Sequence, residues 1–413
     1  MQTFTGWHYL LIDVANQFGI DKLLFEERIT WAEANLDILE SLVDQADKKP
    51  LYMKACQAIR AAQGGKPSGH LVGFDAVCSG IQIMAAITGC PAAAAATGLT
   101  NPNVRADAYT LTTDTMNSIL GTNIVISRAD AKACLMTSFY GSKAKPKEIL
   151  GEDTPELEAF YQAAKIVAPG PWELLQDLLA SWQPWALEHS WKLPDGYDAR
   201  VKVMDQIDAR IEVDELDHAT FTYTYYENVG TKKGLSIAAN VVHSIDGYVL
   251  RAMHRRCNYD PVMVPAARYL INKTLGYRKD LGVLPSVQAL TGKTMYYIEQ
   301  YQRSQLADVV ILPYLTPSNI DQLSTAHLEK LSTLIDQMQM YAPFPIVTIH
   351  DEFKCHPNNL NHLRQQYIFI MADLAESEIL SDVLTQITGY KGKWMKKSKD
   401  LGTHIRLGNY ALS

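Results

Sequence analysis

Two aspartates that follow short apolar runs are the residues of this sequence best suited to metal chemistry. Asp75 directly follows Leu71-Val-Gly-Phe74, and Asp351 comes two residues after Phe344-Pro-Ile-Val-Thr-Ile349. We predict that each run is a buried strand with an aspartate pointing outward at its end, although a lone aspartate there is more often a turn former. A pair of such carboxylates can hold two Mg²⁺ ions about 3.5–4 Å apart, which activate a 3′-hydroxyl and stabilise a leaving pyrophosphate.

A predicted helix over 127–140 carries two cations and a tyrosine. It begins with the capping-box pattern Ser127-Arg-Ala-Asp130. Arg128 and Lys132 are four residues apart and share a face, and Tyr140 lies about 12 Å beyond Lys132. That length suits a nucleoside triphosphate, with the cations at the phosphates and the tyrosine at the sugar and base. The same pattern also occurs as a surface Arg/Lys pair on a capped amphipathic helix.

The elements that must position these residues are mostly helical. Besides the two strands above, Thr220–Tyr226 alternates in the manner of a hairpin strand. The tryptophans Trp172, Trp182, Trp185 and Trp191 are predicted to be core residues and not a stacking platform for bases. Helices are predicted over 7–18, 24–43, 52–62, 107–120, 127–140, 265–275, 328–340 and 360–387.

The composition is that of an ordinary globular protein. Of 413 residues, 47% are apolar, and 38 Lys and Arg against 45 Asp and Glu give a formal net charge of −7. This balance argues against non-specific binding of nucleic acid by bulk charge. The six cysteines are scattered along the chain, which fits free thiols and argues against a structural zinc site.

No segment predicts export or a membrane partner. The amino-terminal residues lack the basic start and apolar run of a signal peptide. The Ala- and Ile-rich segment Ile81–Leu99 is interrupted by Gln82, Gly89 and Pro91, and it falls short of the roughly 20 apolar residues of a membrane span. We therefore predict buried helices for this segment and a cytoplasmic location for the protein.

Three segments together resemble the single-subunit DNA-dependent RNA polymerases of bacteriophages and mitochondria, relatives of the family A DNA polymerases. Phe74-Asp-Ala-Val-Cys-Ser-Gly-Ile-Gln82 is similar to motif A of that family. Arg128-x3-Lys132-x3-Met136-Thr-x2-Tyr140-Gly-Ser-Lys143 is similar to motif B, and His350-Asp-Glu-Phe353 is similar to motif C. Weaker similarities are found at Ile20-Asp-Lys22, Phe25-x2-Arg28-Ile29, Pro194-Asp-Gly196, His243-Ser-Ile-Asp-Gly247 and the carboxy-terminal Tyr410-Ala-Leu-Ser413.

The resemblance implies an α+β right-hand nucleic-acid polymerase with palm and fingers, in which a small antiparallel palm sheet carries both aspartates and the remainder is mostly helical. Residues 1–103 would form the first part of the palm with motif A. Residues 104–242 would form the fingers with motif B and, near 212–234, a hairpin similar to the family's specificity loop. Residues 243–413 would form the second part of the palm with motif C, including an insertion at about 259–340.

The resemblance also implies a reaction, which is DNA-templated RNA synthesis from ribonucleoside triphosphates with two Mg²⁺ ions. Asp75, Asp351 and the backbone carbonyl of Ala76 would be the metal ligands. Arg128 and Lys132 would hold the incoming triphosphate, and Lys132 would give a proton to the leaving pyrophosphate. The DNA template and the RNA product would be the macromolecular partners.

Four further residues would contact the nucleotide or the primer. Tyr140 would distinguish ribose from deoxyribose, with His243 near the 2′-hydroxyl, because a site built to bond a hydroxyl rejects the analogue that lacks it. Tyr109 would lie close to the nucleotide, and His350 would lie beside the primer end.

The acidic run Glu212-Val-Asp-Glu215 argues against duplex promoter reading by the hairpin, so we expect pre-opened DNA or an accessory single-stranded-DNA-binding protein.

Departures from the family pattern leave two other functions open. Glu352 stands where the phage RNA polymerases have serine, and it gives motif C the form found in family A DNA polymerases, so DNA synthesis is an alternative. A non-catalytic scaffold subunit is another. The endings of motif A and motif B, Cys78-Ser-Gly-Ile-Gln82 and Tyr140-Gly-Ser-Lys143, are of the RNA polymerase type and favour RNA synthesis.

The chain has only 74 residues before Asp75, which is much less than a complete phage polymerase has before motif A. We expect a second subunit to supply the amino-terminal domain, the thumb and the start of the palm. This chain would then be the catalytic carboxy-terminal subunit of a split phage RNA polymerase in the cytoplasm of an infected bacterial host. The net charge of −7 fits this expectation, because the partner could bring the positive surface that DNA binding requires.

Overall fold

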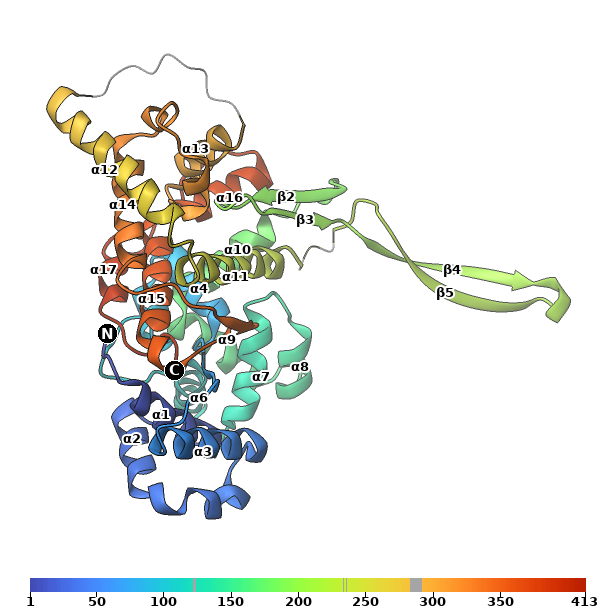
Figure 1. The fold of residues 1–413 in the computed structure, drawn as a ribbon. Coiled ribbons are helices and arrows are strands. Elements are labelled where there is room, and N and C mark those ends of the chain that lie inside the picture. Colours follow the sequence, from blue (N-terminus) through green and yellow to red (C-terminus); the bar gives the residue numbers. More distant parts are fainter. Residues whose placement is uncertain (122–123, 233, 235, 283–291) are drawn as a thin grey trace.

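The computed structural model describes residues 1–121, 124–232, 234, 236–282 and 292–413, which fold mainly into helices (Figure 1). The α-helices are α1 (Gly6–Phe18), α2 (Phe25–Ala34), α3 (Lys49–Gln63), α4 (Ser79–Thr88), α5 (Pro91–Ala96), α6 (Ala108–Leu120), α7 (Arg128–Ser138), α8 (Ala144–Leu150), α9 (Pro155–Val167), α10 (Pro169–Ala180), α11 (Ser236–Cys257), α12 (Met263–Leu281), α13 (Gly292–Ser304), α14 (Thr325–Met338), α15 (Leu360–Glu376), α16 (Ile379–Thr388) and α17 (Leu401–Arg406). The 3-10 helices are η1 (Leu36–Gln45), η2 (Asp214–Leu216), η3 (Val309–Tyr314), η4 (Ile320–Gln322) and η5 (Pro357–Asn359).

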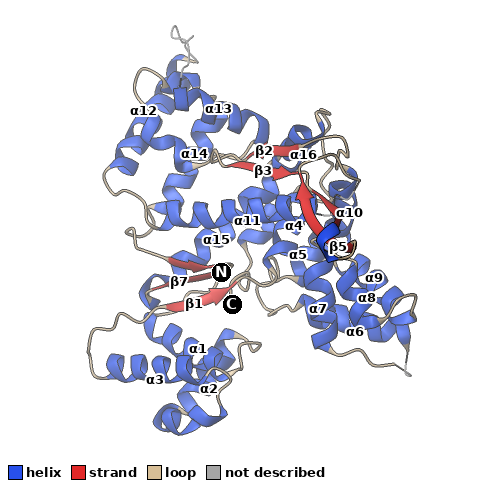
Figure 2. Ribbon diagram, turned by 90° about the vertical axis from the view of Figure 1, so that its right-hand side faces the viewer, coloured by secondary structure: helices blue, strands red, loops and turns tan. Residues whose placement is uncertain are grey.

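The strands are short and form small antiparallel sheets, which Figure 2 shows among the helices. They are β1 (Val72–Asp75), β2 (Glu188–Lys192), β3 (Asp198–Lys202), β4 (Asp205–Val213), β5 (Ala219–Glu227), β6 (Val347–Ile349) and β7 (Glu352–Cys355). One sheet has the order β1-β7-β6, and the other two are the hairpins β2-β3 and β4-β5. This mixture of many helices with small antiparallel sheets confirms the predicted α+β class.

The sheet β1-β7-β6 joins parts of the chain that are far apart in sequence. In its register Val72 lies opposite Cys355, and Asp75 opposite Glu352. Ile349 of β6 pairs with Glu352 of β7, and the two residues between them form the turn that connects the strands. The sheet therefore places the end of β1 beside the β6–β7 turn, as the sequence predicted for the two aspartates.

The strand predicted over 344–349 is shorter and less buried than expected. Only its last three residues pair with β7, and Val347 and Ile349 are exposed, whereas Phe344 and Ile346 before the strand are buried. Pro345 cannot donate a ladder hydrogen bond, and such residues are confined to strand starts and sheet edges. The prediction of a buried strand was therefore wrong for β6, which is an exposed edge strand.

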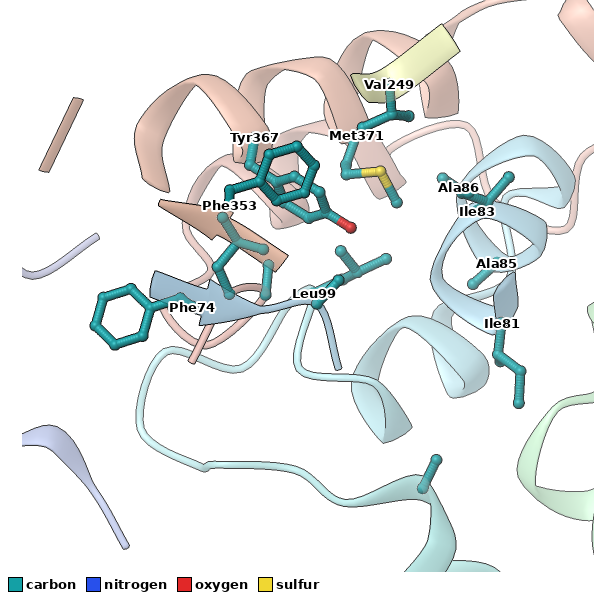
Figure 3. Packing of buried hydrophobic residues seen from close by; sticks show 14 of the residues in the cluster. Phe74, Ile81, Ile83, Ala85, Ala86, Leu99, Val249, Phe353, Tyr367 and Met371 are labelled. Atoms are coloured by element: carbon teal, nitrogen blue, oxygen red, sulfur yellow. The ribbon is translucent and has the colours of Figure 1, made fainter. Parts of the chain in front are cut away.

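One hydrophobic core packs beneath the sheet (Figure 3). Phe353 of β7 lies against Tyr367 of α15, with ring centroids 5.6 Å apart, and α4 contributes apolar side chains from Ile81 onward. Phe74 of β1 packs against Tyr9 and Phe25. Every residue of α4 is buried, which confirms that this part of the Ala- and Ile-rich segment forms a buried helix. None of the helices in the described residues combines the length and apolar character that a membrane span requires.

Helix α11 crosses the centre of the molecule and is fixed by ion pairs along its second half. Arg251 Nε lies 2.6 Å from a carboxylate oxygen of Asp195 in the β2–β3 turn. Arg255 Nη2 lies 2.7 Å from Asp308, whose pKa is lowered by Arg255 although burial alone would raise it. These pairs hold α11 in one position relative to its neighbours.

Two other predictions needed correction. The helix predicted over 24–43 ends at Asn35, where the side-chain amide donates to the Trp31 carbonyl at 2.8 Å and competes with the helical backbone, and a 3-10 helix follows. Among the four tryptophans predicted as core, Trp191 is buried, but Trp185 is exposed. Trp185 lies in the loop between α10 and β2 and is 77% exposed.

The region predicted as an insertion, about 259–340, forms a helical unit with its own hydrophobic cluster, and its residues 283–291 lie outside the described residues. Helices α12, α13 and α14 surround this cluster, to which Ile271, Ile298 and Leu331 belong. The cluster is separate from the main core in the described residues. This helical unit therefore packs around a hydrophobic cluster of its own.

Candidate active site

The two predicted metal ligands meet at the end of the small sheet. Asp75 is the last residue of β1, and Asp351 occupies the second position of the β6–β7 turn. The first position of that turn, His350, has a φ of 54°, which is unusual for a residue other than glycine. The Ala76 N–H donates to the Asp351 carbonyl at 3.1 Å and fixes the turn against β1. The structure thus brings together Asp75, Ala76, His350 and Asp351.

This end of the sheet carries a surplus of negative charge. The pKa of Asp75 is raised because the surrounding atoms displace water from it and because Glu352 and Asp351 lie near. Lys354 pairs with Glu352 at 2.8 Å. A divalent cation would compensate the carboxylates of Asp75 and Asp351, which are hard oxygen donors of the kind that Mg²⁺ prefers.

The donor set therefore fits Mg²⁺ bound by two carboxylates, with water and substrate in the remaining positions. The Ala76 carbonyl is a further candidate metal ligand. The antiparallel pairing of Ala76 with Leu412 is made by the carbonyl of Asp75 and the amide of Val77, so this pairing does not use the Ala76 carbonyl. Within the described residues, a grouping of three close ligand atoms occurs elsewhere, at the exposed tip of the β4–β5 hairpin.

A cavity of about 220 Å³ is lined in part by Asp351. It collects residues from β1–α4, α6, α7, α11 and the β6–β7 turn, all of them far apart in sequence. Predicted site residues that line it are Tyr109, Tyr140, His243, His350 and Asp351. Asp75, Ala76, Arg128 and Lys132 do not line this cavity, but the first two are joined to it through Asp351 and the cations through Tyr109.

Tyr140 lies on the cavity wall just beyond α7, which ends two residues earlier than the sequence predicted. Its ring centroid is 4.7 Å from that of His243. Its hydroxyl lies so close to Gly80 that a Cβ there would come within 2.5 Å of it. Burial and the nearby Cys78, Asp246 and Asp351 raise the pKa of Tyr140, so the hydroxyl stays protonated and can donate a hydrogen bond.

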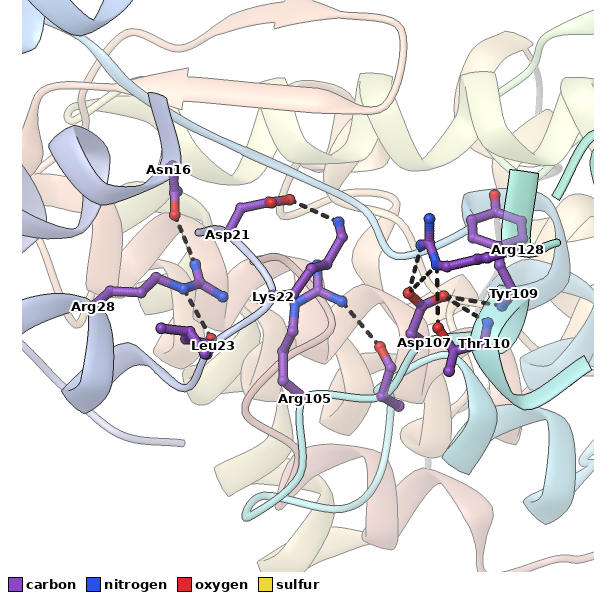
Figure 4. A network of polar contacts seen from close by, with 11 residues as sticks. Asn16, Asp21, Lys22, Leu23, Arg28, Arg105, Asp107, Tyr109, Thr110 and Arg128 are labelled. Atoms are coloured by element: carbon purple, nitrogen blue, oxygen red, sulfur yellow. Dashed lines mark hydrogen bonds and ion pairs between the residues drawn. The ribbon is translucent and has the colours of Figure 1, made fainter. Parts of the chain in front are cut away.

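The predicted cations, Arg128 and Lys132, lie in the amino-terminal part of α7, beside Tyr109. Ser127 caps the helix by accepting from the Asp130 N–H, as the sequence predicted. Lys132 Nζ is 5.4 Å from the centre of the Tyr109 ring, and Lys132 forms no ion pair with a described residue. Arg128 also lies over this ring, and its Nε is 3.1 Å from an oxygen of Asp107 (Figure 4). Lys132 is thus the freer of the two cations.

Two cationic residues outside the predicted set belong to the same neighbourhood. Figure 4 shows Lys22 and Arg105 between the amino-terminal helices and the Asp107–Arg128 pair. The pKa of Arg105 is lowered, mainly because burial removes water from it, while Asp21 and Asp107 oppose this effect. Lys22 could have been identified from the sequence because it lies in one of the weaker similarities, whereas no sequence signal pointed to Arg105.

Asp246 is the acidic residue of the cavity that sequence reasoning did not single out. It lies three residues after His243 on α11, so the two share a face. Burial, and then the negative charge of Asp351, raise the pKa of Asp246 to about 6, against the opposing effect of His350. The spacing within His243-Ser-Ile-Asp-Gly247 was the signal that could have identified it.

The carboxy-terminal segment lies against the same site. The Ser413 N–H donates to the Asp75 carbonyl at 3.1 Å, and the Gln82 side chain donates to the Ala411 carbonyl at 3.0 Å. Tyr410 stacks on Phe25 with ring centroids 4.7 Å apart. The resemblance placed this segment near the active site, and these contacts place it beside Asp75.

Comparison with known proteins finds similarity in the amino-terminal third of the chain. The DNA-dependent RNA polymerase family matches residues 2–145, which include the first aspartate, α7 and Tyr140. A protein of Pseudomonas phage phiKMV named DNA-directed RNA polymerase is 29% identical over 132 residues, which cover 28% of this chain and 16% of that protein. The chain therefore spans less than a fifth of the length of this curated relative. Residues 2–145 are thus similar to the DNA-dependent RNA polymerase family.

Proposed function

We propose that this chain catalyses DNA-templated RNA synthesis, by transfer of nucleotides from ribonucleoside triphosphates with two Mg²⁺ ions. The observation that carries the proposal is the meeting of Asp75 and Asp351 beside a cavity that contains Tyr140. The family match and the phage relative support the reaction class.

In this mechanism the carboxylates of Asp75 and Asp351 and the carbonyl of Ala76 hold the metal. When bound, Mg²⁺ would favour ionisation of the attacking 3′-hydroxyl and neutralise charge on the leaving pyrophosphate. Lys132, which forms no ion pair with a described residue, contacts the triphosphate and gives a proton to pyrophosphate. Arg128 holds the phosphates while Asp107 fixes its guanidinium.

The nucleotide sugar occupies the cavity wall formed by Tyr140 and His243. The Tyr140 hydroxyl hydrogen-bonds to the ribose or its immediate surroundings, and the His243 ring keeps Tyr140 in place. Tyr109 closes the side nearest the cations, and His350 lies beside the primer end. On this proposal residues 1–103 and 243–413 are palm and 104–242 are fingers, with 259–340 inserted in the palm.

We further propose that a second polymerase subunit works with this chain and contributes the amino-terminal domain, the thumb and the start of the palm. Nucleic acid binding requires cationic surface, and the formal charge of this chain is −7. The phage relative is consistent with action in the cytoplasm of an infected bacterium. An accessory single-stranded-DNA-binding protein or pre-opened DNA would assist initiation.

Primer extension on an RNA–DNA scaffold with Mg²⁺ tests the proposal, with the chain purified together with any copurifying subunit. Extension with ribonucleotides is expected from the wild type and from Asp336→Asn, a surface control, but not from Asp351→Asn. Activity retained in Asp351→Asn would overturn the assignment. Extension with deoxynucleotides alone would favour the DNA polymerase alternative suggested by Glu352, and no extension by the complete assembly would favour the scaffold alternative.

A further inference from the structure

The β4–β5 hairpin is an arm that extends away from the rest of the molecule (Figure 1). Its strands pair over nine positions, from Asp205 opposite Glu227 to Val213 opposite Ala219. It overlaps the range predicted for a loop similar to the specificity loop, near 212–234, but begins seven residues earlier, and residue 233 of that range lies outside the described residues. A two-stranded hairpin is marginally stable alone in water, so a long projecting one needs a cover for its apolar side.

The two faces of the hairpin differ in character. Alternate residues of a strand point to opposite faces, and paired residues share a face. One face therefore carries Ile207, Ala209, Ile211, Val213, Ala219, Phe221, Tyr223 and Tyr225, with the acidic pair Asp205 and Glu227 at its base. Four of its large side chains, those of Ile211, Phe221, Tyr223 and Tyr225, are between 40% and 53% exposed, and Ile207 is partly buried. This row is an unpartnered apolar and aromatic surface, which we call the aromatic face.

The base, the tip and the opposite face of the hairpin are acidic and polar. Residues 205–227 contain seven Asp and Glu and a single arginine, Arg210, which gives a formal charge of −6 with histidine neutral. The Arg210 guanidinium is bonded to Thr220 at 2.7 Å. At the tip, His218 lies 2.8 Å from Glu212. This charge repels phosphate, so the hairpin is poorly suited to bind DNA or RNA.

We propose that the aromatic face is a docking surface for a different protein, whose contact site is an apolar groove edged by lysine or arginine. Apolar area flanked by charge of one sign is complementary to a partner of the opposite sign, which gives specificity and faster association. A second copy of this chain would bring the same acidic edges, and a single nucleic-acid strand would bring phosphates. A basic protein partner brings neither acidic residues nor phosphates, so the negative charge of the hairpin does not repel it. This inference does not depend on catalysis by the chain.

Photocrosslinking from opposite faces of the same strand tests the proposal. Benzoylphenylalanine replaces Tyr223 on the aromatic face or Tyr226 on the polar face of the full chain, which is irradiated in its native source. The crosslinked protein is identified by mass spectrometry, purified and titrated against the wild type, the double variant Phe221→Ser/Tyr223→Ser and the matched control Tyr226→Ser. We expect a protein adduct from position 223 alone, binding at least roughly tenfold weaker in the double variant, and weaker binding at higher salt.

The remaining outcomes would overturn the proposal. They are an adduct with DNA, RNA or a second copy of this chain, equal crosslinking from both positions, or binding unaffected by the double variant. Primer extension on the preassembled scaffold separates this test from that of the proposed function. The double variant should extend primers as the wild type does, because the substituted residues lie on the projecting arm. A chain without polymerase activity would leave the crosslinking result unchanged.

Discussion

Replacing Tyr140 with phenylalanine would test the proposed ribose selection with the loss of one oxygen atom. The ring would keep its contact with His243, whose centroid is 4.7 Å away. The wild-type hydroxyl lies against Gly80 and stays protonated, because burial and the neighbouring groups raise its pKa. Tyr140→Phe therefore removes a hydrogen-bond donor while it preserves the packing of the cavity wall.

The size of the effect follows from what a deoxynucleotide would leave behind. Without a 2′-hydroxyl, the Tyr140 donor loses its partner, and an unpaired buried donor costs about 1–3 kcal/mol. Phenylalanine has no donor to leave unpaired, so the variant avoids this cost. At about 1.4 kcal/mol per factor of ten, the preference for ribonucleotides should fall about 5- to 150-fold. The gain should appear mainly in the use of deoxynucleotides.

The assay is single-nucleotide extension of an RNA primer on a DNA template, with kcat/KM measured for ATP and for dATP. Tyr390→Phe is the matched control, because Tyr390 is an exposed tyrosine outside the cavity. The control should keep the wild-type ratio. A Tyr140→Phe protein that extends primers normally with ATP and keeps the wild-type preference would refute the reasoning.

Three other substitutions test separate parts of the structure. Gly80→Ala places a Cβ 2.5 Å from the Tyr140 hydroxyl and should reduce extension strongly, whereas Gly69→Ala, with open space around it, should not. Asp246→Asn should raise the free energy of unfolding by about 2–3 kcal/mol at pH 7.5 in metal-free buffer, because the folded-state pKa is raised to about 6. The contribution of protonated Asp246 to wild-type stability is present below the unfolded-state pKa and is lost as pH rises through 6. The variant and the wild type should therefore have the same free energy of unfolding at pH 3.5. Equal free energies of unfolding at both pH values would contradict this prediction. In urea unfolding, Arg255→Ala should cost about 3 kcal/mol because it leaves Asp308 buried and unpaired, against about 0–1 for Arg268→Ala at an exposed pair; equal losses would contradict the anchoring of α11.

The sequence was informative where local chemistry decides the structure. The strand that ends at Asp75, the Ser127 cap and the apolar run of α4 follow from residue types within a few positions, and all three are found as predicted. The meeting of Asp75 with Asp351 is different, because nothing local joins residues so far apart. It could be predicted only because motif resemblance supplies long-range information that spacing and propensity lack.

What the sequence could not supply depends on contacts across the fold. The end of α2 is set by a side-chain bond that competes with the helix, and the exposure of β6 by its place at the sheet edge. Asp246 is a solvated carboxylate in any helical projection until α11 packs beside Asp351. A perturbed acid of this kind arises from tertiary burial and like charge, and it is detectable only once the cavity exists. The aromatic face of the hairpin depends on contacts beyond the chain itself. Its alternation of apolar and polar residues can be read from the sequence, but the protein that we propose to cover it is a separate molecule.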